Sequence, residues 1–295
     1  MVYGKYDDNG SVFLAFINFM ESFEIPWAPV FGNHDNESKM GADWQCQQLE
    51  NAEYCLFEQK DLTGNGNYTV GIMQDNQLLR VFFMLDSNGC GGASSESLAN
   101  GHTSRSVGFG DDQISWYKKE IENLKASMPN TKISFAFHIQ LQAFADAFAK
   151  YGYDGSVTTQ NIWVTTHANR TEGDFGYIGR KAKDPFDTNG KIFEYLKNAG
   201  VDSIYVGHEH CNSVSVVYQG VRLQYGQKSS AYDRVPSVKT DGTLSVWYVY
   251  GKSGTPLIGG TVIVLSATDG AIKNTSVFYC ENAGGKLNWD SILSK

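Results

Sequence analysis

Three short apolar segments of this chain each lead directly into polar residues that can bind a metal ion. The segments and the residues that follow them lie at 25–35, 132–138 and 201–210. Apolar runs of this length predict short buried strands. Open α/β sheets bind their ligands at the carboxyl ends of their strands, so side chains that directly follow a strand are well placed for chemistry. The repeated pattern predicts an α/β fold whose functional residues lie at one edge of a sheet.

The polar residues at these junctions are of the metal-binding type. The chain contains six histidines. Four of them and one asparagine follow the apolar runs, namely Asn33, His34, His138, His208 and His210. Imidazole nitrogens and amide oxygens bind zinc, iron or manganese. One such histidine is equally typical of an ordinary loop, but the recurrence at three predicted strand ends favours a metal site.

The order and spread of these motifs resemble a known family. Gly32-Asn33-His34-Asp35, the single His138 and Gly207-His208-Glu209-His210 are similar to the motifs of the calcineurin-like metallophosphoesterases. Finer details resemble the purple-acid-phosphatase-like branch of that family, namely Glu37-Ser38, Asp112-Gln113-Ile114-Ser115-Trp116 and His138-Ile139-Gln140-Leu141. The resemblance extends over residues 2–234.

The resemblance implies a fold and a reaction. The implied fold is an α/β four-layer α/β/β/α sandwich of the metallophosphoesterase type, in a single calcineurin-like phosphoesterase domain over residues 1–295. The implied function is that of a metal-dependent phosphoesterase, in which a hydroxide that bridges two metal ions attacks a phosphoric ester. The resemblance implies divalent or trivalent ions of iron, manganese or zinc as cofactors. The implied partner is a small phosphoester substrate.

The resemblance also assigns the metal ligands. Asn33, His138 and His208 would bind the second metal ion of the pair. His210 would bind the first metal ion. Cys211 directly follows His210, but the family pattern does not use it, and we expect it to be a small side chain beneath the site.

Two further residues are assigned to catalysis by the same resemblance. His34 would act as the general acid or as a stabiliser of the transition state, because a leaving alkoxide needs a proton. Asp35 would hold His34 in the correct orientation. Glu209 lies between two implied ligands, and we expect it either to support them or to face the solvent.

The chain departs from the family pattern upstream of Asn33. The family carries an Asp-x-His motif and a Gly-Asp motif before Gly-Asn-His-Asp, and neither is present in this sequence. We therefore expect the fold to be incomplete at its N-terminus, the site to hold one metal ion rather than two, and the activity to be impaired. In a Gly-Asp-x-x-Tyr version of the motif, Tyr3 would be an iron ligand.

A non-catalytic reading of the same residues remains open. The chain would then be a module derived from this fold that binds a phosphorylated ligand or a partner. Retention of His34, Asp35 and His210 favours the enzyme, because a scaffold has little use for them.

Composition excludes some other classes of function. The formal net charge is −8, and since binding to a phosphate backbone needs a basic surface, we expect no nucleic-acid partner. The sequence has no run of about 18 apolar residues, so no membrane span is predicted. No signal peptide is evident, which predicts a cytoplasmic location for the chain as it stands, although a missing upstream segment could carry a signal. The five cysteines lack Cys-x-x-Cys spacing, and Cys46 and Cys55 either pair or remain thiols.

Periodicity along the chain predicts the remaining elements. The expected helices lie at 12–23, 41–57, 111–127, 141–150 and 188–199. The expected strands, besides the three motif strands, lie at 68–73, 78–85, 214–218, 221–225, 243–250, 261–266 and 275–279. The segments at 89–110 and 151–183 have little periodicity, and we expect them to form the wall of the substrate pocket.

Overall fold

The computed structural model describes most of the chain. The described residues are 9–89, 108–154, 161–180, 185–229, 235–248 and 255–280. Tyr3, His102 and about half of the expected pocket wall lie outside them. The chain divides into two compact units; unit 1 comprises Met1–Ile139, Ala199–Val201 and Ala267–Gly270, and unit 2 comprises Gln140–Asn198, Asp202–Ser266 and Ala271–Lys295. The organisation as a single domain stays a prediction.

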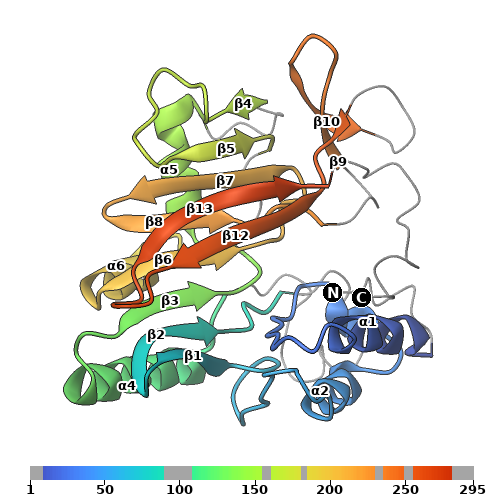
Figure 1. Ribbon diagram of the computed structural model, residues 1–295, viewed down its shortest axis with the longest axis vertical. Coiled ribbons are helices and arrows are strands. Elements are labelled where there is room, and N and C mark those ends of the chain that lie inside the picture. Colours follow the sequence, from blue (N-terminus) through green and yellow to red (C-terminus); the bar gives the residue numbers. More distant parts are fainter. Residues whose placement is uncertain are drawn as a thin grey trace. The chain divides into compact units, whose positions relative to one another are not determined.

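Three neighbouring strands of unit 1 lie in the order β1-β2-β3 (Figure 1). The strands are β1 (Tyr68–Gln74), β2 (Gln77–Met84) and β3 (Lys132–Ala136). β1 and β2 are antiparallel, and β2 and β3 are parallel. The tight β1–β2 turn places Asp75 and Asn76 at positive φ, which these residue types tolerate. Because β2 and β3 are parallel, the residues that follow them reach the same edge of the sheet.

Helix α4 (Asp111–Ser127) packs on β2 and β3. Its buried side chains include Tyr117, Ile121 and Leu124, which recur at helical spacing. The Tyr117 ring meets the Phe135 ring edge-on at 5.4 Å between centroids. The sequence prediction of a helix over 111–127 is confirmed, although Gly110 rather than an aspartate is its N-cap.

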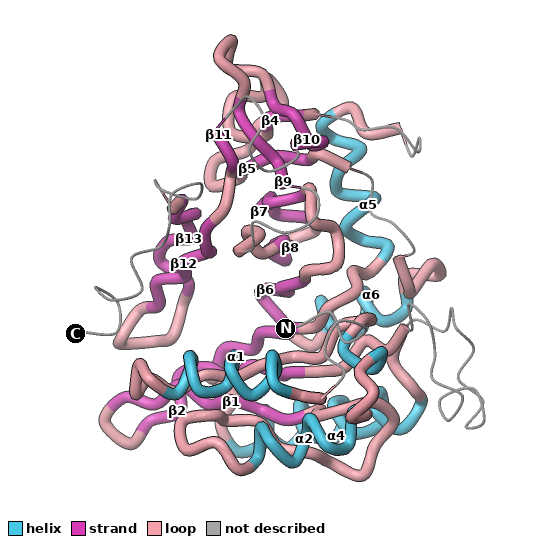
Figure 2. The backbone as a smooth tube through the Cα atoms, turned by 90° about the vertical axis from the view of Figure 1, so that its right-hand side faces the viewer, coloured by secondary structure: helices cyan, strands magenta, loops and turns pink. Residues whose placement is uncertain are grey.

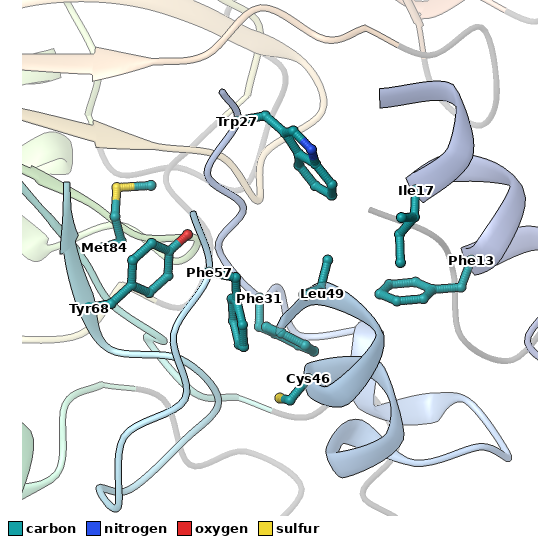
Figure 3. Packing of buried hydrophobic residues seen from close by; sticks show 9 residues of the cluster. All are labelled: Phe13, Ile17, Trp27, Phe31, Cys46, Leu49, Phe57, Tyr68 and Met84. Atoms are coloured by element: carbon teal, nitrogen blue, oxygen red, sulfur yellow. The ribbon is translucent and has the colours of Figure 1, made fainter. Parts of the chain in front are cut away.

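A second core of unit 1 joins helices α1 (Ser11–Glu21) and α2 (Ala42–Glu50) to the sheet. Figure 3 shows the buried side chains of this cluster converging between the two helices and the extended segments beside them. Phe13 and Ile17 lie one helical turn apart on α1, and Leu49 of α2 is fully buried against them. The structure therefore confirms the helix predicted over 12–23 and its apolar face, which packs in the core.

Two sequence predictions in this region are wrong. Residues 25–31 form no strand; only Trp27 makes an isolated bridge, to Cys55. Pro26 and Pro29 have no amide hydrogen to donate, so a continuous ladder cannot form here. The helix predicted over 41–57 ends at Glu50. The following segment is extended because it pairs with Trp27, whose N–H donates to the Tyr54 carbonyl at 3.0 Å.

Arg80 of β2 is fully buried in unit 1. Its Nε donates to the Gly270 carbonyl at 2.8 Å, and its Nη1 donates to the Ser134 hydroxyl at 2.5 Å. These bonds compensate for the removal of the guanidinium from water. Gly270 has a φ of +67°, and a Cβ there would lie 2.5 Å from the Leu79 carbonyl oxygen, so glycine is required for this close approach.

Unit 2 contains five strands in the order β6-β8-β7-β5-β4. They are β4 (Ile162–Trp163), β5 (Phe175–Ile178), β6 (Val201–Val206), β7 (Asn212–Tyr218) and β8 (Val221–Tyr225). The predicted β7–β8 hairpin is confirmed, with Gln219 and Gly220 at positive φ in its turn. Helix α5 (Gln142–Phe148), the 3-10 turn η3 (Ala149–Tyr151) and helix α6 (Lys191–Asn198) complete this part.

Smaller sheets lie beside these strands in unit 2. β12 (Gly259–Leu265) and β13 (Ile272–Tyr279) form an antiparallel pair, and β9 (Val235–Val238) lies between β10 (Leu244–Tyr248) and β11 (Thr255–Pro256). Figure 2 shows the β12–β13 pair on one side of β7 and β8 and helix α5 on the other. Unit 2 is thus layered around its main strands.

These elements define a mixed α/β fold of the kind seen in metallophosphoesterases, as the sequence predicted. Within the described residues, no helix combines the length and the apolar character that a membrane crossing needs.

Candidate active-site residues

The Gly32–Asp35 turn of unit 1 is closed by the Asp35 carboxylate. Asp35 Oδ2 accepts the Gly32 N–H at 2.7 Å, and the Asp35 N–H donates to the Gly32 carbonyl at 3.2 Å. Asp35 is buried, and its own carbonyl accepts a bond from Gln45 Nε2 of helix α2 at 2.8 Å. These bonds hold the turn against α2, so that Asn33 and His34 are carried by a fixed backbone.

His138 follows β3 and lies directly over this turn. A Cβ at Gly32 would lie 3.1 Å from both Cε1 and Nδ1 of the His138 ring and 3.2 Å from its Cδ2. His138 Nε2 and Asn33 Oδ1 are 2.9 Å apart, although the two residues are 105 positions apart in the chain. The structure therefore brings two of the sequence-predicted ligands into contact, and glycine at position 32 makes room for the ring.

His34 is paired with a carboxylate that the sequence reasoning left without a role. His34 Nδ1 lies 2.8 Å from Glu37 Oε1, across the short 3-10 turn η2 (Asp35–Glu37). The other carboxylate oxygen of Glu37 is buried and has no hydrogen-bond partner among the described residues. A carboxylate at Nδ1 favours the imidazole tautomer in which that nitrogen carries the proton. The role of Asp35 in orienting His34 stays a prediction.

Asp86 is a second buried carboxylate of unit 1, two residues beyond the end of β2. Its Oδ2 accepts the Asn65 N–H at 2.9 Å and its Oδ1 accepts the Asn88 N–H at 2.8 Å. Burial raises the pKa of Asp86 from 3.8 to about 6, in spite of these bonds, and the charge of Asp35 adds to the increase. Asp86 therefore lies in the electrostatic field of the Gly32–Asp35 turn.

The motif around Gln113 supports this edge of the sheet. Gln113 is fully buried at the start of α4, where its Nε2 donates to Asn67 Oδ1 and to the Asp86 carbonyl. Its Oε1 accepts the Gly110 N–H. Nearby, the Ser87 hydroxyl accepts the Ile139 N–H at 2.8 Å, next to His138. The glutamine thus fixes the loop after β2, which in turn contacts the loop that carries His138.

The other two predicted ligands lie in unit 2, directly after β6. His208 has a φ of +69°, an uncommon conformation for a residue other than glycine. The Glu209 N–H donates to the Gly207 carbonyl at 2.8 Å, and the Asn212 N–H donates to the Glu209 carbonyl at 3.1 Å. Tight hydrogen bonding thus maintains a strained backbone in the segment that carries His208 and His210.

Glu209 is buried rather than exposed to solvent. Its Oε2 lies 3.8 Å from Nη1 of Arg180. Arg180 is held by Asn212, whose Oδ1 accepts the Arg180 N–H at 3.0 Å. Burial, with a contribution from the Glu209 charge, raises the pKa of Tyr225 well above its usual value. Of the two expectations for Glu209, the structure therefore favours support of its neighbours. Cys211 is buried among apolar side chains, as expected.

The candidate site residues fall into two groups, one in each unit. Unit 1 carries Asn33, His34, Asp35 and His138, and unit 2 carries His208 and His210. Among the described residues, no group of three or more His, Cys, Asp or Glu side chains is arranged to hold a metal ion. The convergence of the two groups stays a prediction. Cys46 and Cys55 are free thiols in the structure.

The chain belongs to the calcineurin-like phosphoesterase family, which it matches over residues 1–212. Members of this family are metal-dependent phosphoesterases that generally use two metal ions. This confirms the resemblance on which the sequence predictions depend.

Two curated proteins are similar to this chain. A protein of Arabidopsis thaliana named "Probable inactive purple acid phosphatase 29" is 25% identical over 225 residues, which are 69% of this chain and 50% of that protein. Phosphatase DCR2 of Saccharomyces cerevisiae is 23% identical over 215 residues, 70% of this chain and 33% of that protein. The chain thus spans a half and a third of the lengths of these relatives.

Proposed function

We propose that this chain hydrolyses small phosphoric esters with the help of bound metal ions. Asn33, His138 and His208 would hold one ion, and His210 would contribute to a second. A metal ion bound there supplies an activated water and neutralises charge on the phosphoryl oxygens. The proposal is supported chiefly by the approach of Asn33 Oδ1 to within 2.9 Å of His138 Nε2 across Gly32.

These two atoms lie within hydrogen-bonding distance of each other, so an imidazole nitrogen and an amide oxygen, both ligand types for zinc, iron or manganese, are already side by side. The positive φ of His208 is a second supporting observation, because strained backbone of this kind clusters at functional sites.

His34 would act on the leaving group. Glu37 occupies its Nδ1, so Nε2 is the atom that would donate a proton to the departing alkoxide or bind a phosphoryl oxygen. Asp35 fixes the backbone on which His34 is carried.

The proposed ligands are unequally divided between the two ions. Three of them serve one ion and only His210 serves the other. We therefore propose that this chain holds one ion more firmly than a second and that its turnover is correspondingly weak.

The test is metal stoichiometry combined with hydrolysis of an aryl phosphate in the presence of added manganese or iron. His138→Ala should lose the firmly held ion together with turnover, and His34→Ala should lose turnover while it retains the ion. His167→Ala is the matched control, because this ring lies against Tyr151, away from the proposed ligands. Equal metal content and equal turnover in all three variants would refute the proposal.

A non-catalytic binding module is the second candidate. It is favoured by the likeness to a relative whose name describes it as probably inactive. Binding of inorganic phosphate to the metal-loaded chain without any turnover of aryl phosphate, and loss of that binding in His138→Ala, would support this candidate over the enzyme.

A further inference from the structure

A pocket in unit 2 has an unusually cationic lining. It encloses about 490 Å³ and lies beside β5 and β13. Arg170, Arg222 and Lys273 line it, and no Asp or Glu is among the described residues that do so. Over the whole chain the acidic residues outnumber the basic ones by 32 to 24, so this local composition is opposite to the average. Such a lining favours an anionic ligand.

The two arginines are held in place by backbone carbonyls. Arg222 Nη1 donates to the Gly173 carbonyl at 3.0 Å and to the Ser215 hydroxyl at 2.8 Å. A Cβ at Gly173 would lie 3.2 Å from Arg222 Nη2, so glycine permits this close packing. Arg170 Nε donates to the Asp174 carbonyl at 2.6 Å. Guanidinium groups fixed in this way lose little entropy when a ligand binds.

Among the described residues, Arg170, Arg222 and Lys273 form no ion pair with a carboxylate. The ion pairs among the described residues involve other cations, namely His34, Lys60, Lys150, Arg180 and Lys197.

We propose that this pocket binds a small molecule that carries a phosphoryl group attached to a flat ring. Arginine forks match the geometry of phosphoryl oxygens. Trp163, Phe175 and Tyr279 provide apolar surface for the ring. The volume lies within the range of small-molecule sites. None of the lining residues is a proposed catalytic residue or metal ligand, so binding does not require a metal ion.

The test uses the full chain after treatment with a chelator, with phenyl phosphate as the probe in a calorimetric titration at low salt. We expect one molecule to bind per chain, and we expect the affinity to fall as salt is added. Arg170→Gln and Arg222→Gln should each weaken binding by about tenfold or more, because each removes charged hydrogen bonds. Lys273→Gln should also weaken it, and Lys239→Gln, an exposed lysine elsewhere in unit 2, should not.

Unchanged binding in Arg222→Gln, or no binding to the metal-free chain at millimolar probe, would overturn the inference. Binding that appears only after metal is added and is lost in His138→Ala would also overturn it, while supporting the proposed function.

Discussion

Gly32→Ala should weaken metal binding without unfolding the protein. The added methyl would lie 3.1 Å from two atoms of the His138 ring and 3.2 Å from a third. Carbon atoms in ordinary contact are about 3.5–4.0 Å apart, so the ring must withdraw by about 0.3–0.5 Å. Metal–ligand distances tolerate only about 0.2 Å. We therefore expect the affinity for the firmly held ion to fall about 10–100-fold, the range seen when groups that orient a ligand are changed.

The assay is competition for zinc or manganese against a chelator of known affinity, with circular dichroism to verify the fold. Gly260→Ala is the matched control, because a Cβ there meets no heavy atom within 4 Å. If Gly32→Ala binds metal as tightly as the unaltered chain while His138→Ala does not bind it, then the ring is not positioned by its contact with Gly32, and the reasoning fails.

Three other substitutions test the buried groups of unit 1. Burial raises the pKa of Asp86 from 3.8 to about 6, so between these pH values the folded state retains a proton that the unfolded state has lost. The free energy of unfolding should therefore decline by up to about 3 kcal/mol as the pH rises from about 4 to about 6. In Asp86→Asn, denaturant unfolding of the metal-free chain should show this slope flattened, and an unchanged slope would assign it to other groups. Glu37→Gln should change the free energy of unfolding by no more than about 1 kcal/mol, since one of the Glu37 oxygens has no described partner. It should lower the kcat of aryl phosphate hydrolysis about tenfold, because it loosens His34. Equal kcat values for the variant and the unaltered chain would contradict this. Leu49→Ala should cost about 2–5 kcal/mol in urea unfolding because the side chain is fully buried, whereas Leu56→Ala, which is largely exposed, should cost less than about 0.5 kcal/mol.

Elements with a strong local pattern were predictable from the sequence. Helix α4 has apolar residues at helical spacing, and the β7–β8 hairpin has Gln219-Gly220 between two alternating runs. β1, β2, β3 and β6 are short apolar runs bounded by polar residues, and each forms at the predicted place. In these cases the local preference and the tertiary contacts agree.

Elements that depend on distant partners were not predictable. β5 pairs with β7, and Gly176 within it has a φ of +93°. A Cβ there would lie 2.0 Å from the Ser213 carbonyl oxygen, so only glycine fits this position. Glycine in such a position removes the alternation by which a strand is recognised. The helix predicted over 41–57 includes residues 53–57, but the pairing of this segment with Trp27 overrides its local preference for a helix.

Some features of the candidate site were also predictable from the sequence, and others were not. The ligand-type residues that follow β3 and β6 were predictable from the sequence, whereas Asn33 and His34 follow a segment that forms no strand. The bond between Glu37 and His34 was not, because it depends on the 3-10 turn that Asp35–Glu37 adopts. The cationic pocket was also hidden, since Arg170, Arg222 and Lys273 come from three separate segments that only the folded chain assembles.

The bond from Arg80 to Gly270 has a consequence for synthesis on the ribosome. The two residues are 190 positions apart, so most of the chain must leave the exit tunnel before the Gly270 carbonyl can accept this bond. Until then, the guanidinium of Arg80 lacks one of the groups that later compensate its burial, and β2 is held short of its final stability. Unit 1 therefore combines residues that are synthesised far apart in time, and a chaperone that shields its sheet has a long interval in which to act.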